Sequence, residues 1–373
     1  MAGCINDGAF GSSAKGPSCK PKLAVCLKLQ SRRDGRLVGA ALGPHSPEGN
    51  QMYMPAQAAR ASTQYELPFT NRPTLRKPCA PLEPDGTCFQ HGQASLELAD
   101  CFAWLKAREP RSIEAVVTDP PYGVNEFQTD QIHKLRHGGG GVWRSPSSLG
   151  GQRRAAVPRF TALTSTDLRA LELFYTRFAH LIARVVVPGA NVIVAAHPLL
   201  SHFVARAMAA AGLEVRGTIV RQITTLRGGD RPKGAELEFT DVSVMPRSNW
   251  EPWLIFRAPL EGRVQDNLRR WRTGGFRRCS ADRPFGDLIQ SQPARPVERA
   301  LAPHPCLKPQ AFLRTIIRAA LPLRKGLILD PFAGSGSTLA AANAMGYRSI
   351  GIERDPVYFE MAKGAVSGLQ KLA

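Results

Sequence analysis

Short apolar runs alternate with amphipathic segments over most of this chain of 373 residues. The runs Ile113 to Thr118, Ala190 to Ala196 and Leu327 to Leu329 are too short for helices, which predicts strands buried on both faces of a parallel sheet. The segments Thr166 to Val187 and Gln310 to Leu321 have apolar residues at helical spacing. The alternation predicts an α/β fold with a mixed, mostly parallel sheet and helices on both faces.

The same criteria place the remaining elements. Strands are predicted at Thr87 to His91, Leu213 to Ile223, Pro252 to Arg257 and Arg348 to Glu353, and helices at Ala94 to Ala107, at Leu199 to Ala211 and from Pro356, with Asp355 as its N-cap.

Residues 1–84 differ from the rest because Pro, Gly, Ser, Lys and Arg interrupt every periodic pattern. We interpret them as a disordered basic extension, either a tail without function or in part a start-site artefact, since Met52 and Met54 are alternative beginnings. Residues 85–368 are predicted to form one domain with inserted basic loops at about 125–162, 224–240 and 261–303.

A glycine loop follows the predicted strand that ends at Asp330. Gly334 and Gly336 permit a tight turn and a close approach of backbone to a ligand, and Ser337 begins a helix whose N–H groups point outward. The next strand ends at Glu353, about where an acid grips ribose hydroxyls. This pattern predicts an adenosine-containing ligand; a nicotinamide dinucleotide and a turn that serves packing alone are the alternatives.

A second chemical signal follows the strand that ends at Thr118. The segment Asp119 to Tyr122 reads Asp-Pro-Pro-Tyr, and a double proline fixes a turn because it can continue neither a strand nor a helix interior. The turn would present the Asp119 carboxylate and the Pro120 carbonyl as hydrogen-bond acceptors, with Tyr122 as an aromatic platform. A rigid turn after a strand, without a chemical role, is the alternative interpretation of this segment taken alone.

Together the two signals resemble a known family. Asp119 to Tyr122, Asp330 to Gly336 (Asp-Pro-Phe-Ala-Gly-Ser-Gly) and His304 to Pro309 (His-Pro-Cys-Leu-Lys-Pro) resemble the signatures of the amino-group DNA methyltransferases that use S-adenosylmethionine. The resemblance covers about Thr87 to Gly368. It implies a Rossmann-like methyltransferase fold, circularly permuted as in the beta subgroup, where the catalytic half comes first.

The resemblance implies a role for each segment. An exocyclic amine is a poor nucleophile because its lone pair is delocalised into the ring, and the acceptors Asp119 and Pro120 would free that pair. Pro121 completes the turn, and Tyr122 would stack on a base that has left the duplex. The cofactor residues would be Asp330, Phe332, Gly334, Gly336, Thr338 and Glu353, with Lys308 near the methionine carboxylate and Gln93 in place of the family's usual aspartate near the adenine.

The charge favours a nucleic-acid partner. Lys and Arg number 49 against 30 Asp and Glu, a formal charge of +19, although a generally basic composition is the alternative. Candidate contacts to double-stranded DNA lie in the inserted loops; they are Lys134, Arg136, Trp143, Arg144, Arg269, Arg270 and Arg272. The eight cysteines form no Cys-x-x-Cys pair, which predicts reduced thiols in a cytoplasmic protein and no structural metal. No apolar run approaches the roughly 20 residues of a membrane span.

The sequence therefore predicts a sequence-specific DNA methyltransferase that forms N6-methyladenine. The Asp at position 119 favours adenine within the family, with N4-cytosine as the alternative. Methylation of RNA or of a protein amide, and a DNA-binding protein with an inactive site, are more distant alternatives. A partner restriction endonuclease and a monomer or homodimer remain open.

Overall fold

A nine-stranded mixed sheet forms the centre of the part of the chain that the structure, a computed structural model, describes. That part comprises residues 87–122, 142–143, 157–158, 163, 165–223, 231–232 and 234–372. Along the sheet the strands are β1 (Cys88–His91), β2 (Ala94–Leu98), β11 (Arg348–Glu353), β10 (Leu327–Asp330), β3 (Ile113–Thr118), β6 (Val186–Ala195), β8 (Trp250–Arg257), β7 (Glu214–Gln222) and β9 (Leu288–Gln290).

The central strands β2, β11, β10, β3 and β6 are parallel, whereas β8 runs antiparallel to both β6 and β7. A separate pair consists of β4 (Val142–Trp143) and β5 (Val157–Pro158). The helices are α1 (Cys101–Ala107), α3 (Ser165–Val185), α4 (Ser201–Ala210), α5 (Val264–Trp271), α6 (Pro296–Leu301), α7 (Gln310–Ala320), α8 (Ser337–Ala344) and α9 (Pro356–Lys371).

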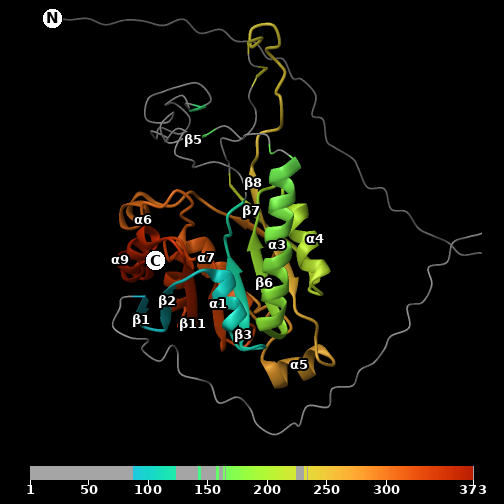
Figure 1. The fold of residues 1–373 in the computed structure, drawn as a ribbon, viewed down its shortest axis with the longest axis vertical. Coiled ribbons are helices and arrows are strands. Elements are labelled where there is room, and N and C mark those ends of the chain that lie inside the picture. Colours follow the sequence, from blue (N-terminus) through green and yellow to red (C-terminus); the bar gives the residue numbers. More distant parts are fainter. Residues whose placement is uncertain are drawn as a thin grey trace, which may run out of the picture. The chain divides into compact units, whose positions relative to one another are not determined.

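Side chains alternate between two apolar layers, as the period of a strand requires. Val116 and Val192 pack with α1, α3 and α4 on one face, whereas Ala115, Val117 and Ile193 pack with α7 and α8 on the other (Figure 1). Because both faces are covered, the strands need apolar residues at every position, which explains the continuous runs in the sequence. The prediction of an α/β sheet with helices on both faces is confirmed.

One predicted helix is wrong in its first half. Residues 94–98 form β2 instead, and only Cys101–Ala107 is helical. Gly92, at φ 59°, turns the chain back on β1, and β2 then pairs in parallel with β11. The helix begins after Asp100, whose carboxylate accepts the Ala103 N–H at 2.9 Å.

Some predictions lie outside the described residues. These are the disordered extension 1–84, most of the inserted loop at 125–162, and residues 224–230 and 233 of the inserted loop at 224–240. Circular permutation of the fold stays a prediction. Among the described residues, no helix has the length and hydropathy needed to cross a bilayer.

The cap of α9 gives a test of the local fold. Asp355 accepts the Val357 N–H at 2.8 Å, and Pro356 follows as the first helical residue, as the sequence predicted. We expect Asp355→Ala to lower the free energy of unfolding by about 1 kcal/mol, because an N–H of the first turn loses its partner. Chemical denaturation would measure this. Glu360→Ala, on the exposed side of the same helix, is the control and should change stability by less than half as much.

Candidate functional site

The two predicted chemical segments meet at the carboxyl ends of neighbouring strands. β3 and β10 are parallel, with Leu329 opposite Val116. At their ends the Thr118 hydroxyl donates to Asp330 Oδ1 at 2.7 Å, and both residues are buried. Asp119 follows Thr118 directly, so its turn lies beside the glycine loop that follows Asp330. Carboxyl ends of parallel strands are where ligands bind in open α/β sheets.

The turn at Asp119 is held by hydrogen bonds as well as by its prolines. The Tyr122 hydroxyl donates to Asp119 Oδ1 at 2.6 Å, and the buried Tyr175 of α3 donates to the Pro121 carbonyl at 3.1 Å. Pro120 is buried and Pro121 is exposed. Asp119 is therefore fixed as an acceptor, and the Tyr122 ring is anchored through its hydroxyl.

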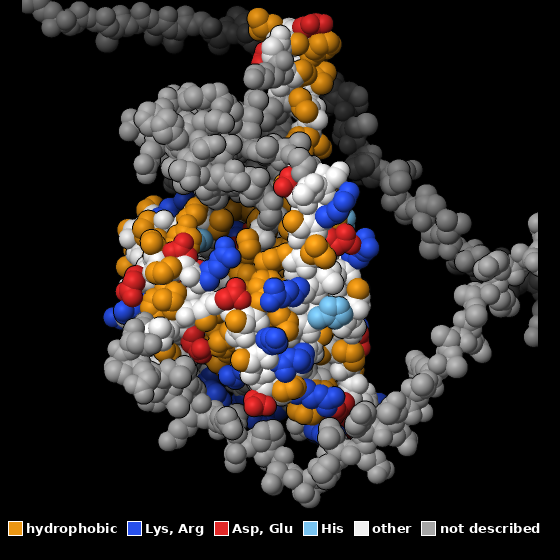
Figure 2. Space-filling view, viewed as in Figure 1, with side chains coloured by type: hydrophobic (Ala, Val, Ile, Leu, Met, Phe, Trp, Pro, Cys, Tyr) orange, Lys and Arg blue, Asp and Glu red, His pale blue; other side chains and the backbone are white. Residues whose placement is uncertain are grey.

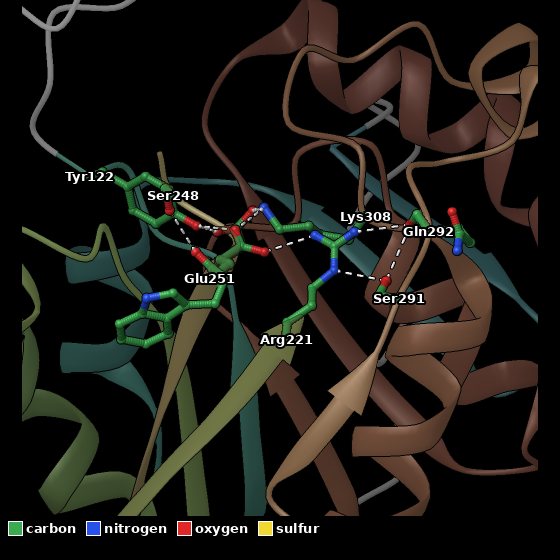
Figure 3. A network of polar contacts seen from close by, with 9 residues as sticks. Tyr122, Arg221, Ser248, Glu251, Ser291, Gln292 and Lys308 are labelled. Atoms are coloured by element: carbon green, nitrogen blue, oxygen red, sulfur yellow. Dashed lines mark hydrogen bonds and ion pairs between the residues drawn. The ribbon is translucent and has the colours of Figure 1, made fainter. Parts of the chain in front are cut away.

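A largely buried charge network adjoins Asp119, and its members Lys308, Glu251 and Arg221 are labelled in Figure 3. Lys308 Nζ forms an ion pair with Asp119 Oδ2 and a second one with Glu251 Oε1 at 3.2 Å. Glu251 Oε2 pairs with Arg221 at 2.8 Å, and the Tyr122 hydroxyl lies 2.9 Å from Glu251 Oε1. Lys308 was predicted to approach a cofactor carboxylate; in the structure its ammonium lies between two carboxylates of the chain itself.

The environments of the two carboxyls push their pKa values apart. Burial raises the pKa of Asp119, and the opposing effect of Lys308 does not fully compensate. Burial also raises the pKa of Glu251, but the cations Lys308 and Arg221 outweigh it and hold this pKa at about 2. Burial lowers the pKa of Lys308, but Asp119 and Glu251 raise it more. Glu251 and Lys308 are thus fixed ions, whereas Asp119 is the member that can take up a proton.

The glycine loop is closed by Glu353. The Gly334 N–H donates to Glu353 Oε2 at 2.8 Å, and the Asp355 N–H donates to Oε1 at 2.9 Å. Gly336 has φ 73°, and an added Cβ would lie 2.6 Å from Val366 Cγ2 of α9, so no other residue fits there without a shift. Thr338 is buried in the first turn of α8.

Phe332 fixes the other side of the loop. Its ring centroid lies 5.4 Å from that of Phe178 and 5.9 Å from that of Phe174, both on α3. Asp330, Phe332, Gly334, Gly336, Thr338 and Glu353 therefore gather at one edge of the sheet. Their role in holding a cofactor stays a prediction.

Gln93 lies at the wrong edge of the sheet for the role predicted for it. It belongs to the turn before β2, where its carbonyl accepts the Ser349 N–H at the start of β11. Glu353 ends β11, so Gln93 and Glu353 lie at opposite ends of the same strand pair. The acid that follows β2 at the carboxyl edge is Asp100, next to Ala99, whose N–H donates to the Glu353 carbonyl. Because residues 94–98 were predicted to be helical, β2 was missed, and the position expected near the adenine was placed before this strand instead of after it.

The predicted DNA-contacting arginines of α5 lie away from Asp119. The Asn267 side chain donates to the Pro188 carbonyl at 3.0 Å, which holds α5 at the amino end of β6, opposite to the edge where β3 ends. Arg269 pairs with Asp266, and Arg270 pairs with Glu261. Arg272 ends the helix at φ 65°. A DNA-binding role for these three arginines stays a prediction, and it is separate from the edge that carries Asp119.

The structure gives no single location for the remaining predicted DNA contacts or for the excess of Lys and Arg over acidic residues. Lys134, Arg136 and Arg144 lie outside the described residues, and of Trp143 only the backbone, in β4, is described. On the face drawn in Figure 2, Lys and Arg side chains are interspersed with acidic and apolar ones instead of gathering in one basic surface. The described part of the chain contains no group of three His, Cys, Asp or Glu arranged to hold a metal ion.

Sequence reasoning missed Arg221 and Glu251. They are register partners on β7 and β8, and both side chains are largely buried. Charged residues of opposite sign inside two paired strands were a signal, because a charge inside a sheet needs a partner.

Comparison with known proteins bears on the same segments. Residues 248–364 match the model of a family described as DNA methylase. This match contains Glu251, Lys308 and the glycine loop, and the Asp-Pro-Pro-Tyr turn lies beside them in the fold. Over residues 248–364, which are less than half of its length, the chain is thus similar to the DNA methylase family.

Two curated relatives match over short stretches. The type II methyltransferase M2.DpnII of Streptococcus pneumoniae is 37% identical over 78 residues, which are 21% of this chain and 28% of the relative. M.ScaI of Streptomyces caespitosus is 43% identical over 61 residues, 16% of this chain and 20% of the relative. The chain thus spans about a quarter of the length of these relatives.

Among solved structures, the PvuII DNA methyltransferase, which is cytosine-N4-specific, has a TM-score of 0.47 at 15% identity. The match covers 75% of this chain and 87% of that one.

His304, the first residue of the segment His304 to Pro309, predicts a pH dependence of stability. Its ring packs against the glycine loop, since a Cβ added at Gly334 would lie 3.2 Å from Nε2. Burial, with a contribution from the Lys308 charge, lowers the pKa of His304 to about 4. As the pH falls from about 6.5 to about 4, the unfolded chain binds a proton that the folded chain does not, so stability is lost.

We expect His304→Gln to flatten the fall in stability over that interval, by at most about 3 kcal/mol. Denaturation at a series of pH values, with variant and parent compared, isolates the effect from that of the carboxyls. The exposed His202 provides the control, as His202→Gln should leave the parent's slope unchanged. If the free energy of unfolding falls equally steeply with pH in His304→Gln and in the parent, the assignment of His304 as a buried, neutral ring is contradicted.

Proposed function

We propose that this protein transfers a methyl group from S-adenosylmethionine to the exocyclic amino group of a base in double-stranded DNA. The observation that supports it most is the hydrogen bond between Thr118 and Asp330, because it joins the acceptor turn to the glycine loop. A donor at the loop and an amine at Asp119 can then meet without any large movement of the chain. Catalysis is mainly positioning.

The residues of the loop fit the cofactor. Backbone N–H groups at the start of α8 face the loop, and an N-terminal helix end favours a carboxylate. Glu353 retains lone pairs beyond the two N–H groups that it accepts, and these suit ribose hydroxyls. Asp100, at the end of the strand pair, is the acid placed to accept from an adenine amino group. The cofactor supplies an electrophilic methyl group on a sulfonium.

The chain's own residues then act on the amine. Asp119 accepts an N–H hydrogen bond from the target amine, which favours a tetrahedral nitrogen with a free lone pair. Its raised pKa suits it to take the proton that the methylated nitrogen releases. Direct attack of the amine on the methyl group needs no covalent intermediate with a cysteine, and Cys101 is unsuited to one because burial raises the pKa of its thiol to about 12.

We propose adenine N6 as the target, from the Asp at the first position of the turn, with cytosine N4 as the second candidate. Mass spectrometry of nucleosides from DNA treated with the protein and S-adenosylmethionine distinguishes them. N6-methyladenine supports the proposal, N4-methylcytosine corrects the base, and unmodified DNA under conditions of demonstrated cofactor binding contradicts the activity.

Variants separate the two halves of the site. We expect Asp119→Ala and the closer analogue Asp119→Asn to lower the rate of methyl transfer by at least about 100-fold, because the anionic acceptor is lost. Cofactor affinity, measured by calorimetry, should change by less than about threefold, roughly 0.6 kcal/mol. A large loss of cofactor affinity in Asp119→Asn would place Asp119 in the cofactor site instead.

Gly336→Asp should show the opposite pattern and lose cofactor binding first. A matched control exists in Gly346, which has φ 72° but no atom within 4 Å of an added Cβ. Gly346→Asp carries the same backbone strain without the contact at the loop. Equal cofactor affinity in the two variants would contradict the assignment of the glycine loop as the pocket.

A further inference from the structure

Asp119 has both of its oxygens engaged by groups of the chain. Oδ1 accepts from the Tyr122 hydroxyl, and Oδ2 from the Lys308 ammonium. Under the proposed function, on which this inference rests, the target amine must also donate to this carboxylate. An uncharged amine competes poorly with an ammonium for one oxygen, because hydrogen bonds from a charged donor are about twice as strong. Each oxygen keeps a second lone pair, but an oxygen that already accepts from an ammonium is a weaker acceptor, so the hydrogen bond from the amine is strengthened when Lys308 is drawn away from Oδ2.

Both donors share a second partner. The Tyr122 hydroxyl lies 2.9 Å from Glu251 Oε1, and Lys308 Nζ lies 3.2 Å from the same atom. A hydroxyl has one proton, so Tyr122 can donate to only one of the two carboxylates at a time. Glu251 Oε1 is thus the position to which both hydrogen bonds can move over a short distance.

Glu251 itself is held still. Its Oε2 accepts from Arg221 at 2.8 Å, and the Arg221 guanidinium also donates to Ser291 Oγ at 3.0 Å and to the Gln292 carbonyl at 3.3 Å (Figure 3). The guanidinium carbon lies 5.1 Å from the centroid of the Phe312 ring. The network contains two acids and two bases, so its formal charge is balanced.

We propose that Glu251 is an exchange acceptor: when the target amine donates to Asp119, Lys308 and the Tyr122 hydroxyl transfer their hydrogen bonds to Glu251. Glu251 and Lys308 are then positioning residues, and Arg221 anchors Glu251. The nitrogen forms its bond to the methyl carbon, the carbon–sulfur bond breaks with its electron pair on sulfur, and the proton of the nitrogen passes to Asp119. Because Lys308 has moved to Glu251, the Asp119 carboxylate is more basic at the moment when it receives that proton.

A double-mutant cycle on single-turnover methyl transfer tests the exchange. Glu251→Gln leaves Lys308 with Asp119 as its one anionic partner in the network, so transfer should slow by about 10-fold or more. Lys308→Met leaves two buried carboxylates without their shared cation and should also slow transfer. The double variant removes one charge of each sign and frees Asp119, so it should be faster than either single variant. If instead the fold-losses in transfer rate of the two single variants multiply in the double variant, the proposal is overturned.

Cofactor affinity gives the second readout. The exchange predicts that Lys308→Met binds S-adenosylmethionine within about twofold of the parent, roughly 0.4 kcal/mol. A loss of about 10-fold or more would mean that Lys308 holds the methionine carboxylate, and it would overturn the exchange. If the parent transfers no methyl group to DNA, the proposed function fails; if the parent is active and the cycle is multiplicative, the exchange alone fails.

Controls use another ion pair on the same two strands. Glu214 and Arg257 are register partners at the opposite end of β7 and β8, and Glu214→Gln should leave transfer unchanged. Thermal unfolding of each variant checks the fold, because Glu251→Gln leaves the Arg221 charge without its carboxylate. Should that variant unfold, Arg221→Met combined with Glu251→Gln removes both charges. Lys308→Met is then added to this pair of substitutions. Faster transfer than in the Lys308→Met single variant supports the exchange, and multiplied losses of transfer rate overturn it.

Discussion

The hydrogen bond from Thr118 to Asp330 joins two segments that are separated by 212 positions in the chain. It lies at the end of the β3–β10 pair, where the backbone of both strands leaves the sheet and the ladder can no longer hold them together. A buried carboxylate that accepts from Thr118 and from the Phe332 N–H fixes the start of both loops at once. Every distance between the acceptor turn and the glycine loop depends on this junction.

The junction lowers stability. Burial raises the pKa of Asp330 to about 6, so above that pH the folded state holds an ionised carboxyl that would be more stable in water. Relative to the usual value of 3.8, the cost is about 3 kcal/mol at neutral pH. The large apolar layers on both faces of the sheet offset this cost. A group that lowers stability but orders two loops is characteristic of a functional site.

The sequence was sufficient for the parts that depend on local pattern. Continuous apolar runs identified β3, β6 and β10, and the N-cap and proline identified the start of α9, because burial on both faces and helix capping leave a direct record in residue type. The segment from Ala94 to Ala107 was different. Its apolar residues fit a helix through Leu105, but β2 pairs with β11, whose register partners lie 255 positions further along the chain, and this pairing overrides the local preference. Because this strand was missed, the residue expected near the adenine was placed at Gln93, whereas Asp100 lies at the other end of β2, on the carboxyl edge of the sheet.

The charge network shows why the rest of the site could not be predicted. Asp119, Arg221, Glu251 and Lys308 come from four segments, and each alone is an ordinary charged residue. Lys308 precedes a proline ahead of a helix, which suited a solvated contact to a ligand equally well. Only the order of β3, β8 and β7 in the sheet, with α7 across them, brings the four charges together. Once they are together, their balance follows from physics: two fixed cations hold Glu251 ionised, and the remaining carboxyl, Asp119, keeps the freedom to exchange a proton on which the proposed chemistry relies.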